Sequence, residues 1–237
     1  MSSHNIFAII PARKGSKGID NKNLQLIGNK PMIQFTFDSA KQVARIDSLV
    51  LSSDDEKIIS LAKKIGVDAP FIRPSNLSLD DSKTSDVVLH SLEWYEASFG
   101  QMPKNIMLLQ PTSPFRTSND INHAINKFIS SKKKTLVSVT EVSQHPGDCL
   151  VKSDEGKFSR LDLRSDSHKE IGRQGFLETF FIDGSIYISD TMEFLASNDL
   201  VGSNPEICLI PQSHGIDIDT NFDLSIARAM HSSGIVS

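Results

Sequence analysis

The sequence predicts an α/β protein with a mostly parallel sheet covered by helices on both faces, and three observations carry this prediction. Short apolar runs alternate with stretches of helical periodicity from the start of the chain. The first run, Ile6 to Ile10, contains no polar residue, which is typical of a strand buried on both faces. Polar loops follow these runs, and loops after parallel strands share the sheet edge where α/β proteins bind ligands. We therefore expect the functional residues at that edge.

Each further element is predicted from its own pattern. Apolar residues at helical spacing mark three helices, namely Ile33, Phe37, Ala40 and Ala44; Val88, Leu92 and Tyr95; and Ile121, Ile125, Phe128 and Ile129. Pro31 suits the first helical position, and Gly66 suits the end of a helix that begins with the acids of residues 54–56. Short apolar runs predict strands at 48–52, 106–109, 135–140 and 184–189. An extended segment at 216–219 then precedes a last helix, where Thr220 and Asp223 resemble a capping box.

Length and composition limit the class of protein. The 237 residues, 38% hydrophobic and 23% charged, suit one soluble domain with a sizeable core. A net charge of −4 provides no overall attraction to nucleic acid or anionic membrane, and no apolar run is long enough to span a membrane. No secretory signal is evident, and two cysteines make no disulfide framework, so we expect a cytoplasmic protein with free thiols.

The alternation of strands and helices breaks between Glu141 and Ile182. Residues 152–173 include eleven charged residues, six basic and five acidic, with few apolar ones. Such a stretch is too polar for a core element of the sheet. We therefore expect residues 141–182 to be an arm inserted in a single domain of residues 1–237, and we interpret the arm as a contact with a second subunit. A solvated flap on a monomer is the alternative.

A basic loop at residues 11–23 directly follows the first strand and is the first candidate site. Gly15 and Gly18 allow backbone amides to approach a ligand closely. Its cationic donors are Arg13, Lys14, Lys17 and Lys22. Within residues 1–30, five Lys and Arg stand against one acid, an excess that suits a triphosphate. The loop is neither GxxxxGKS/T nor GxGxxG, so P-loop and dinucleotide-binding folds lack their fingerprint. A solvated basic turn is the alternative.

Two further motifs lie toward the same predicted edge. Prolines stiffen the segment Gln-Pro-Thr-Ser-Pro-Phe-Arg, residues 110–116, after the strand at 106–109. We expect its polar residues, Gln110, Thr112, Ser113 and Arg116, to be held toward a polar ligand, with a stiff connector as the alternative. Asp217 and Asp219 alternate along an extended segment, so both carboxylates share one face. Two adjacent acids repel unless a cation such as Mg²⁺ lies between them; solvent-facing aspartates are the alternative.

Taken together and in this order, the three motifs resemble those of CMP-sialic acid synthetases, the N-acylneuraminate cytidylyltransferases, a family that includes enzymes for legionaminic and pseudaminic acid. The similarity extends from about Ile6 to the final helix and is weakest in the charged arm. The resemblance implies a three-layer nucleotide-diphospho-sugar transferase fold of Rossmann-like type. It also implies transfer of CMP from CTP to a nine-carbon 2-keto sugar acid with release of pyrophosphate, Mg²⁺ as cofactor, and a homodimer held by the arm.

The resemblance assigns site residues by matching motifs. The nucleotide-binding residues that it implies are Arg13, Gly15, Ser16, Lys17, Lys22, Asn23, Arg73 and Thr84. The sugar-binding residues are Gln110, Arg173 and Tyr187, and the metal-binding residues are Asp217 and Asp219. Arg13, Lys17 and Asp219 are the implied catalytic residues, because the two cations would stabilise charge on the phosphates and the aspartate would hold Mg²⁺. Arg173 would pair with the sugar carboxylate, and no residue is assigned as a general base.

The chain departs from the family pattern on the sugar side. Relatives commonly read Arg-Pro-Asn-Gly-Ala-Ile-Tyr at residues 181–187, where this chain has Asp183 in place of the asparagine. Asp148 stands where relatives often have a lysine. The resemblance therefore implies CTP as the nucleotide but leaves the sugar acid open among sialic, legionaminic and pseudaminic acids.

Two alternative functions remain. One is a Kdo-type or other sugar nucleotidyltransferase, against which the Gly-Ser-Lys-Gly loop and the Gln110 segment argue. The other is an inactive relative that binds a nucleotide sugar, against which the retention of Arg13, Lys17 and both aspartates argues.

Overall fold

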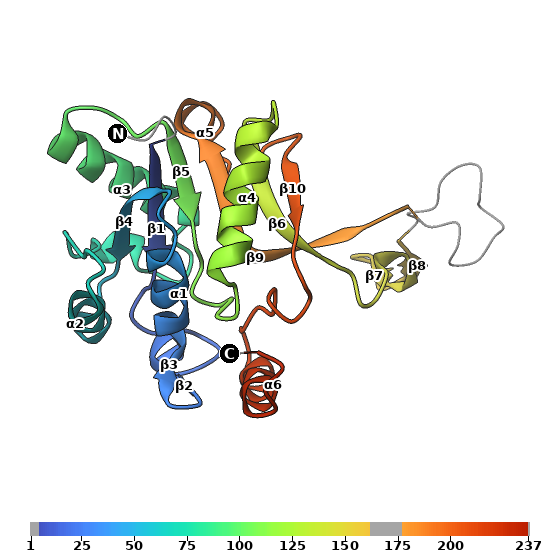
Figure 1. Cartoon of the computed structure of the whole chain (residues 1–237). Coiled ribbons are helices and arrows are strands. Elements are labelled where there is room, and N and C mark those ends of the chain that lie inside the picture. The colour runs from blue at the N-terminus through green and yellow to red at the C-terminus, as the bar shows by residue number, and fades with distance from the viewer. Residues whose placement is uncertain (1–4, 162–176, 237) are drawn as a thin grey trace. The chain divides into compact units, whose positions relative to one another are not determined.

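A six-stranded sheet forms the centre of the larger part of the chain (Figure 1). The computed structural model describes residues 5–161 and 177–236. The strands of the sheet are β1 (Ile6–Pro11), β4 (Ile46–Ser52), β5 (Asn105–Leu108), β6 (Thr135–Glu141), β9 (Phe180–Asp190) and β10 (Glu206–Leu209), in the order β10-β6-β9-β5-β1-β4. β1 pairs in parallel with β4 and β5, and β10 pairs in parallel with β6, whereas β9 runs antiparallel to β5. The sheet is therefore mostly parallel, as the sequence predicts.

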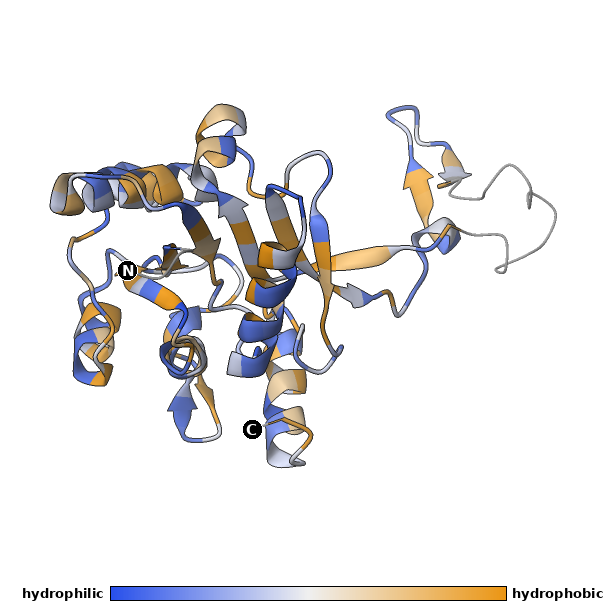
Figure 2. Cartoon of the chain, turned by 45° about the horizontal axis from the view of Figure 1, so that its top comes forward, coloured by the Kyte–Doolittle hydropathy of each residue, from blue (hydrophilic) through white to orange (hydrophobic). Residues whose placement is uncertain are grey.

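The alternating side chains of β1 face two hydrophobic cores, which makes the fold three-layered. The helices around the sheet are α1 (Met32–Lys41), α2 (Glu56–Ile65), α3 (Thr84–Phe99), α4 (Ser118–Ser130) and α5 (Thr191–Ser197). Ile6, Ala8 and Ile10 pack with α1, α2 and α4, while Phe7 and Ile9 pack with α3 and α5 (Figure 1). Figure 2 shows apolar residues along the central strands and on only part of each surrounding helix. Both faces of the sheet are thus covered by amphipathic helices.

Local capping explains where several helices begin and end. The Asp55 carboxylate accepts hydrogen bonds from two backbone amides in the first turn of α2, and Gly66 ends that helix with φ at +81°. Thr117 forms a capping box with Asp120 at the start of α4. Helix α6 (Asn221–Ser232) begins with the predicted box of Thr220 and Asp223.

The structure corrects a few details of the predicted elements. Pro31 is the last residue of the short strand β3 and precedes α1 rather than opening it, because its ψ of 140° is not helical. Ala44 lies beyond α1 and is exposed, and Val43 fills the core instead. Residues 216–219 form no strand, although Ile218 is fully buried between the two aspartates. Strand β10 has no counterpart in the prediction, because its four residues alternate too briefly to give a pattern.

Contacts divide the chain into two compact units, residues 1–139 with 182–237 and residues 140–181. The larger unit also contains the hairpin β2 (Leu26–Ile27) with β3 (Lys30–Pro31), and the short helices η1 (Lys22–Leu24) and η2 (Ser75–Leu77). The smaller unit contains η3 (Pro146–Asp148) and an antiparallel hairpin of β7 (Leu150–Lys152) and β8 (Phe158–Arg160). In the hairpin Leu150 is 63% exposed and Phe158 is 65% exposed. No helix in the described part of the chain is long and apolar enough to cross a membrane.

A buried polar cluster joins the segment after β5 to strand β9. The Arg116 guanidinium is fully buried and donates to the carbonyls of Ser185 at 2.6 Å and Gln110 at 3.2 Å, and to the Thr36 hydroxyl at 2.9 Å. Burial lowers the pKa of Arg116 to about 10, and the charges of Asp183 and Asp120 oppose this effect. These acceptors stabilise a cation that would otherwise be costly to remove from water.

Asp183 is the buried acid of this cluster. Its Oδ1 accepts hydrogen bonds from the Ser138 hydroxyl at 2.6 Å and the Ser185 amide at 2.8 Å, whereas its Oδ2 is buried and has no hydrogen-bond partner among the described residues. Burial raises the pKa of Asp183 above its ordinary value of 3.8, although the hydrogen bond from Ser138 opposes this shift. The folded state therefore binds a proton at Asp183 more tightly than the unfolded state does.

We expect this pKa difference to appear in the stability of Asp183→Asn. The stability that comes from the raised pKa is present below pH 3.8 and is lost as the pH rises through the folded value. The asparagine has no charge to bury, so the free energy of unfolding of the variant minus that of the wild type should increase from pH 4 to pH 7. The increase is about 1.4 kcal/mol for each unit of pKa difference, measured by urea unfolding. A flat or falling difference for Asp183→Asn would contradict the assignment.

Candidate active site

A cavity of about 400 Å³ opens at the carboxyl edge of strands β1, β4 and β5. Its walls come from the segments after β1 and β5, from the stretch of residues 73–87 that follows α2 and enters α3, and from the segment before α6. The residues that line it are Pro11, Arg13, Gly15, Ser16, Lys22, Asn23, Arg73, Leu77, Leu79, Asp80, Ser82, Thr84, Val87, Gln110, Pro111, Thr112, Asp217 and Asp219. The three motifs of the sequence therefore meet in one place, as parallel strands dictate.

Hydrogen bonds to its backbone hold the basic loop after β1 in place. The Lys14 amide donates to the Asp54 carboxylate at 2.6 Å, and the Asn23 side chain donates to the Arg13 carbonyl at 3.3 Å. A Cβ on Gly18 would lie 2.4 Å from the Asp219 carbonyl oxygen, so only glycine permits this close approach. The loop and the Asp217–Asp219 segment therefore pack directly against each other.

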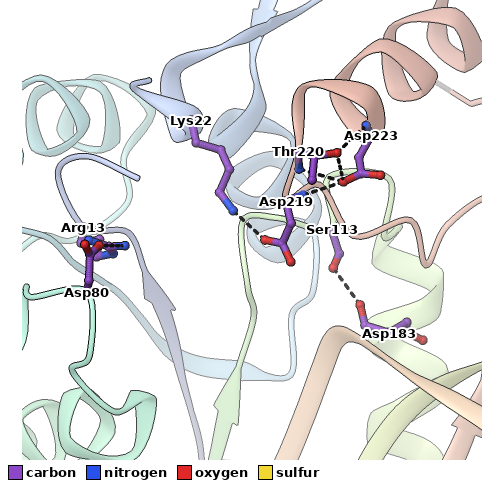
Figure 3. Close-up of polar contacts among 8 residues, drawn as sticks. All are labelled: Arg13, Lys22, Asp80, Ser113, Asp183, Asp219, Thr220 and Asp223. Carbon is purple, nitrogen blue, oxygen red and sulfur yellow. Dashed lines mark hydrogen bonds and ion pairs between the residues drawn. The ribbon is translucent and has the colours of Figure 1, made fainter. Parts of the chain in front are cut away.

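Asp80 lies across the cavity from the basic loop and binds two of its cations. Its carboxylate is 2.6 Å from Nη2 of Arg13 (Figure 3). The same carboxylate is 3.4 Å from Nζ of Lys17. The hydrogen bond from Arg13 lowers the pKa of Asp80, and Lys17 adds to the effect. The Arg13 end of the loop thus meets an acid from the segment between η2 and α3.

The other end of the basic loop meets the acidic pair. Nζ of Lys22 is 3.0 Å from Oδ1 of Asp219 (Figure 3), and the Lys22 side chain is 13% exposed whereas that of Asp219 is 70% exposed. The Asp219 amide donates to the Asp223 carboxylate at 3.2 Å, within the capping box of α6. The helix cap therefore fixes the backbone of Asp219 while its carboxylate projects into the cavity.

Asp217 is held by the segment after β5. The Thr112 hydroxyl hydrogen-bonds the Asp217 carboxylate, and the Thr112 carbonyl accepts from the Ile218 amide at 2.9 Å. Burial raises the pKa of Asp217, the Thr112 hydrogen bond opposes this shift, and the nearby Asp219 adds to it. Oδ1 of Asp217 is buried and has no hydrogen-bond partner within the described ranges. An unpartnered carboxylate oxygen beside a second carboxylate is an arrangement that favours a cation.

Arg73 and Thr84 line the opposite wall. The Arg73 guanidinium is 5% exposed, and its Nε donates to the Ser52 hydroxyl at 3.1 Å while Nη2 donates to the Ser52 carbonyl. Burial lowers the pKa of Arg73 to about 10, and Asp54 counteracts the shift. Thr84 is the first residue of α3. The end of β4 therefore positions the arginine at this wall.

The segment at 110–116 corrects the prediction that all its polar residues face a ligand. Gln110 and Thr112 line the cavity, but Ser113 is fully buried and Arg116 is 1% exposed. The Ser113 hydroxyl donates to the Asp183 carbonyl at 3.2 Å, so these two side chains are held by β9 and not by a ligand. Gly184 makes the close approach possible, because a Cβ there would lie 2.8 Å from Oε1 of Gln110. The segment has one face toward the cavity and one toward the sheet.

Two described residues of the predicted site, Lys17 and Tyr187, do not line the cavity, and the position of a third is not described. Lys17 is 77% exposed and reaches it only through its ion pair with Asp80. Tyr187 lies in β9, packs against the α3 core, and has a pKa raised to about 12, mainly by burial. Arg173 lies outside the described residues. Of the two departures from the family pattern, Asp183 is buried beneath the site and Asp148 belongs to the smaller unit.

Motif matching did not single out several residues in or beside the cavity wall. They come from two parts of the chain. Asp54 shapes the basic loop from the segment after β4, a position that the predicted sheet edge alone would have suggested. Leu77, Leu79 and Val87 supply an apolar wall from η2 to α3, for which the sequence has no local signal. Side chains of this kind are recognised only when distant segments come together.

The chain has the features of a three-layer α/β enzyme, with a basic loop and an acidic pair in contact at one cavity on the carboxyl edge of the sheet. Residues 7–173 match the family described as Cytidylyltransferase. The chain belongs to this family, and it is a nucleotidyltransferase of the N-acylneuraminate cytidylyltransferase type.

Similar proteins cover nearly the whole chain. It is 29% identical over 223 residues to the pseudaminic acid cytidylyltransferase of Campylobacter jejuni, covering 94% of each protein. It is 31% identical over 229 residues to the CMP-N,N'-diacetyllegionaminic acid synthase of Legionella pneumophila, covering 95% of each. It is 29% identical to the N-acylneuraminate cytidylyltransferase of Escherichia coli, of which it covers 51%.

Solved structures share the fold. The structure of CMP:2-keto-3-deoxy-manno-octonic acid synthetase complexed with CTP matches with a TM-score of 0.69 at 18% identity, covering 97% of this chain and 99% of that one. The 4-diphosphocytidyl-2C-methyl-D-erythritol synthase of Anaerococcus prevotii matches with a TM-score of 0.66 at 16% identity, covering 96% and 98%. The predicted nucleotidyltransferase fold is confirmed.

The contact between Thr112 and Asp217 predicts a matched pair of variants. Thr112→Val keeps the shape of the side chain but removes the hydroxyl, so Asp217 loses a hydrogen bond in a half-buried site. We expect the affinity for a divalent cation in the presence of CTP to fall about tenfold, measured with Mn²⁺ by electron paramagnetic resonance. Thr112→Ser restores the hydroxyl and should stay within about threefold of the wild type. A loss in Thr112→Ser with no loss in Thr112→Val would show that the methyl group matters and not the hydroxyl, and equal losses would contradict a role for the hydroxyl alone.

Proposed function

We propose that this chain transfers CMP from CTP to a nine-carbon 2-keto sugar acid and releases pyrophosphate. The observation that carries the proposal is the cavity in which Arg13 and Lys22 of the basic loop, Gln110, and the pair Asp217 and Asp219 meet. The names of the relatives over 94–95% of the chain support the same reaction class. A Kdo-type activity is not favoured, since the Kdo enzyme shares the fold at only 18% identity.

The reaction requires positioning and charge neutralisation more than covalent help from the protein. The anomeric hydroxyl oxygen of the sugar acid attacks the α-phosphorus of CTP, the bond to the β-phosphate oxygen breaks, and pyrophosphate departs. Arg13, Lys17 and Lys22 would neutralise charge on the α-phosphate and on the leaving pyrophosphate. Arg73 and Thr84 would bind the cytidine part at the opposite wall. Gln110 would orient the sugar acid, together with Tyr187 and Arg173.

Asp217 and Asp219 fit a divalent cation that shares oxygens with substrate phosphates. Oδ1 of Asp217 is buried without a partner among the described residues, and Asp219 lies beside it with an exposed carboxylate. Within residues 5–161 and 177–236, no three acidic, histidine or cysteine side chains cluster to hold a metal by themselves. Mg²⁺ suits this arrangement because it is commonly bound through one or two carboxylates plus phosphate oxygens. When bound, it would neutralise phosphate charge at this end of the cavity.

Release of pyrophosphate from CTP and Mg²⁺ tests the proposal directly. We expect turnover with at least one of N-acetylneuraminic, legionaminic and pseudaminic acids, and about 100-fold less with Kdo. The matched control is Asp219→Ala, which should reduce turnover to background because it removes one of the two proposed metal ligands. Inactivity of the wild type with every nine-carbon acid, or near-normal turnover of the variant, would refute the proposal.

We further propose a homodimer in which residues 141–182 contact the second subunit. Four apolar side chains of the smaller unit support this proposal because each is about half exposed or more: Leu150, Val151, Phe158 and Phe181. Apolar side chains gathered on a small hairpin are typical of an interface. We also propose a cytoplasmic location, which the two free thiols of Cys149 and Cys208 support.

Sedimentation velocity distinguishes the dimer from a monomer with a solvated flap. The double variant Leu150→Lys with Phe158→Lys places two charges on the apolar hairpin and should shift the wild-type dimer to monomer. Phe222→Lys is the control, because Phe222 is 74% exposed on α6 and lies outside the arm. A wild-type monomer, or a dimer that survives the double variant, would contradict the proposed role of the arm.

A further inference from the structure

Asp80 forms ion pairs with Arg13 and Lys17, the two cations that the proposed function assigns to the triphosphate. Its carboxylate lies 2.6 Å from Nη2 of Arg13 and 3.4 Å from Nζ of Lys17, and the same loop supplies Lys22, which pairs with Asp219 (Figure 3). Two carboxylates therefore pair with three of the loop's cations. A triphosphate needs the same donors, and its oxygens and the Asp80 carboxylate are both anions. Arg13 and Lys17 cannot give their full charge to both.

Asp80 and Asp219 would interact differently with a bound nucleotide and its metal ion. Asp219 lies beside Asp217, so a divalent cation could replace Lys22 as its counter-charge. Asp80 lies at the Arg13 end, where no second acidic side chain binds these cations among the described residues. An anionic phosphate approaching Arg13 would meet Asp80 with repulsion rather than with a shared metal.

The position of Asp80 permits an exchange. Its side chain is 40% exposed, and its neighbours Leu79 and Asp81 are exposed as well. The Ser82 hydroxyl holds the turn around it, accepting from the Leu79 amide at 3.0 Å and donating to the Asn76 carbonyl at 3.1 Å. The carboxylate can therefore rotate toward solvent while the backbone of the cavity wall stays in place.

We propose that Asp80 is an internal competitor of the polyphosphate: it binds Arg13 and Lys17 in the empty site, gives them up to the nucleotide, and takes them back as pyrophosphate leaves. This inference rests on the proposed function, because it assigns the two cations to the phosphates. Asp80 thereby lowers the affinity of the site for polyphosphate and favours release of the product. Its effect acts on the phosphate part of the ligand and leaves the cytidine part unchanged.

The experiment compares Asp80→Asn with Asp81→Asn in the full chain. Both variants remove one negative charge from the same turn, but only Asp80 bonds to Arg13 and Lys17. Titration calorimetry with pyrophosphate, CTP and cytidine, each in the presence of Mg²⁺, provides the readout. We expect Asp80→Asn to bind pyrophosphate and CTP about five- to tenfold more tightly than the wild type, and pyrophosphate to inhibit it more strongly by the same factor. Cytidine affinity should be unchanged, and Asp81→Asn should stay within about twofold of the wild type for every ligand.

Other outcomes overturn the inference in distinguishable ways. Weaker binding of pyrophosphate by Asp80→Asn would mean that Asp80 orients Arg13 for the phosphate. An equal gain in pyrophosphate affinity in both variants would mean that the negative charge of the turn as a whole matters, and not the ion pairs of Asp80. A parallel change in cytidine affinity would place the effect in the base pocket. If the wild type binds neither CTP nor pyrophosphate, the proposed function falls and this inference with it. Asp80→Ala repeats the comparison without the hydrogen-bonding amide, and it should also tighten binding.

Discussion

The buried guanidinium of Arg116 is the interaction on which the geometry of the site depends. It is fully buried between the segment after β5, strand β9 and helix α1, and it donates to one acceptor from each. A cation in this place is tolerated only while those acceptors and the charges of Asp183 and Asp120 remain near it. These hydrogen bonds hold the three elements together. They also fix the position of residues 110–112, the part of the segment after β5 that faces the cavity.

The acidic end of the cavity follows from that rigid segment. Thr112 contacts both Asp217 and Ile218, and Gly18 packs against the Asp219 carbonyl, so the basic loop and the aspartates are each positioned against a neighbour. The Asp223 carboxylate of the capping box of α6 fixes the backbone of Asp219. The net charge of −4 is therefore an average over a local arrangement in which cations and carboxylates face each other at ion-pair distance. Such an arrangement suits a substrate that carries both phosphates and a metal ion.

Local sequence patterns predict much of the fold and many of the site residues. Continuous apolar runs predict β1 and β5 closely, because a strand buried on both faces is recognised from its own residues. The short β10 escapes prediction, since its four residues carry too little periodicity. Ten of the thirteen predicted site residues line one cavity; Lys17 stands beside it, Tyr187 packs in the core, and Arg173 lies outside the described residues.

The class of fold, the order of its elements and the residue types that meet at the carboxyl edge follow from the sequence alone, because they depend on local periodicity and on the geometry of parallel strands. Which polar side chains remain available to a ligand depends on contacts between distant segments. Ser113 and Arg116 belong to the same motif as Gln110 and Thr112, yet their partners lie 69 or 70 residues away on β9. The role proposed for Asp80 likewise depends on its ion pair with Arg13, which lies far from it in the chain. Hydrogen bonds and ion pairs act over about 3 Å in space, and no local pattern records which distant acceptor lies within that distance.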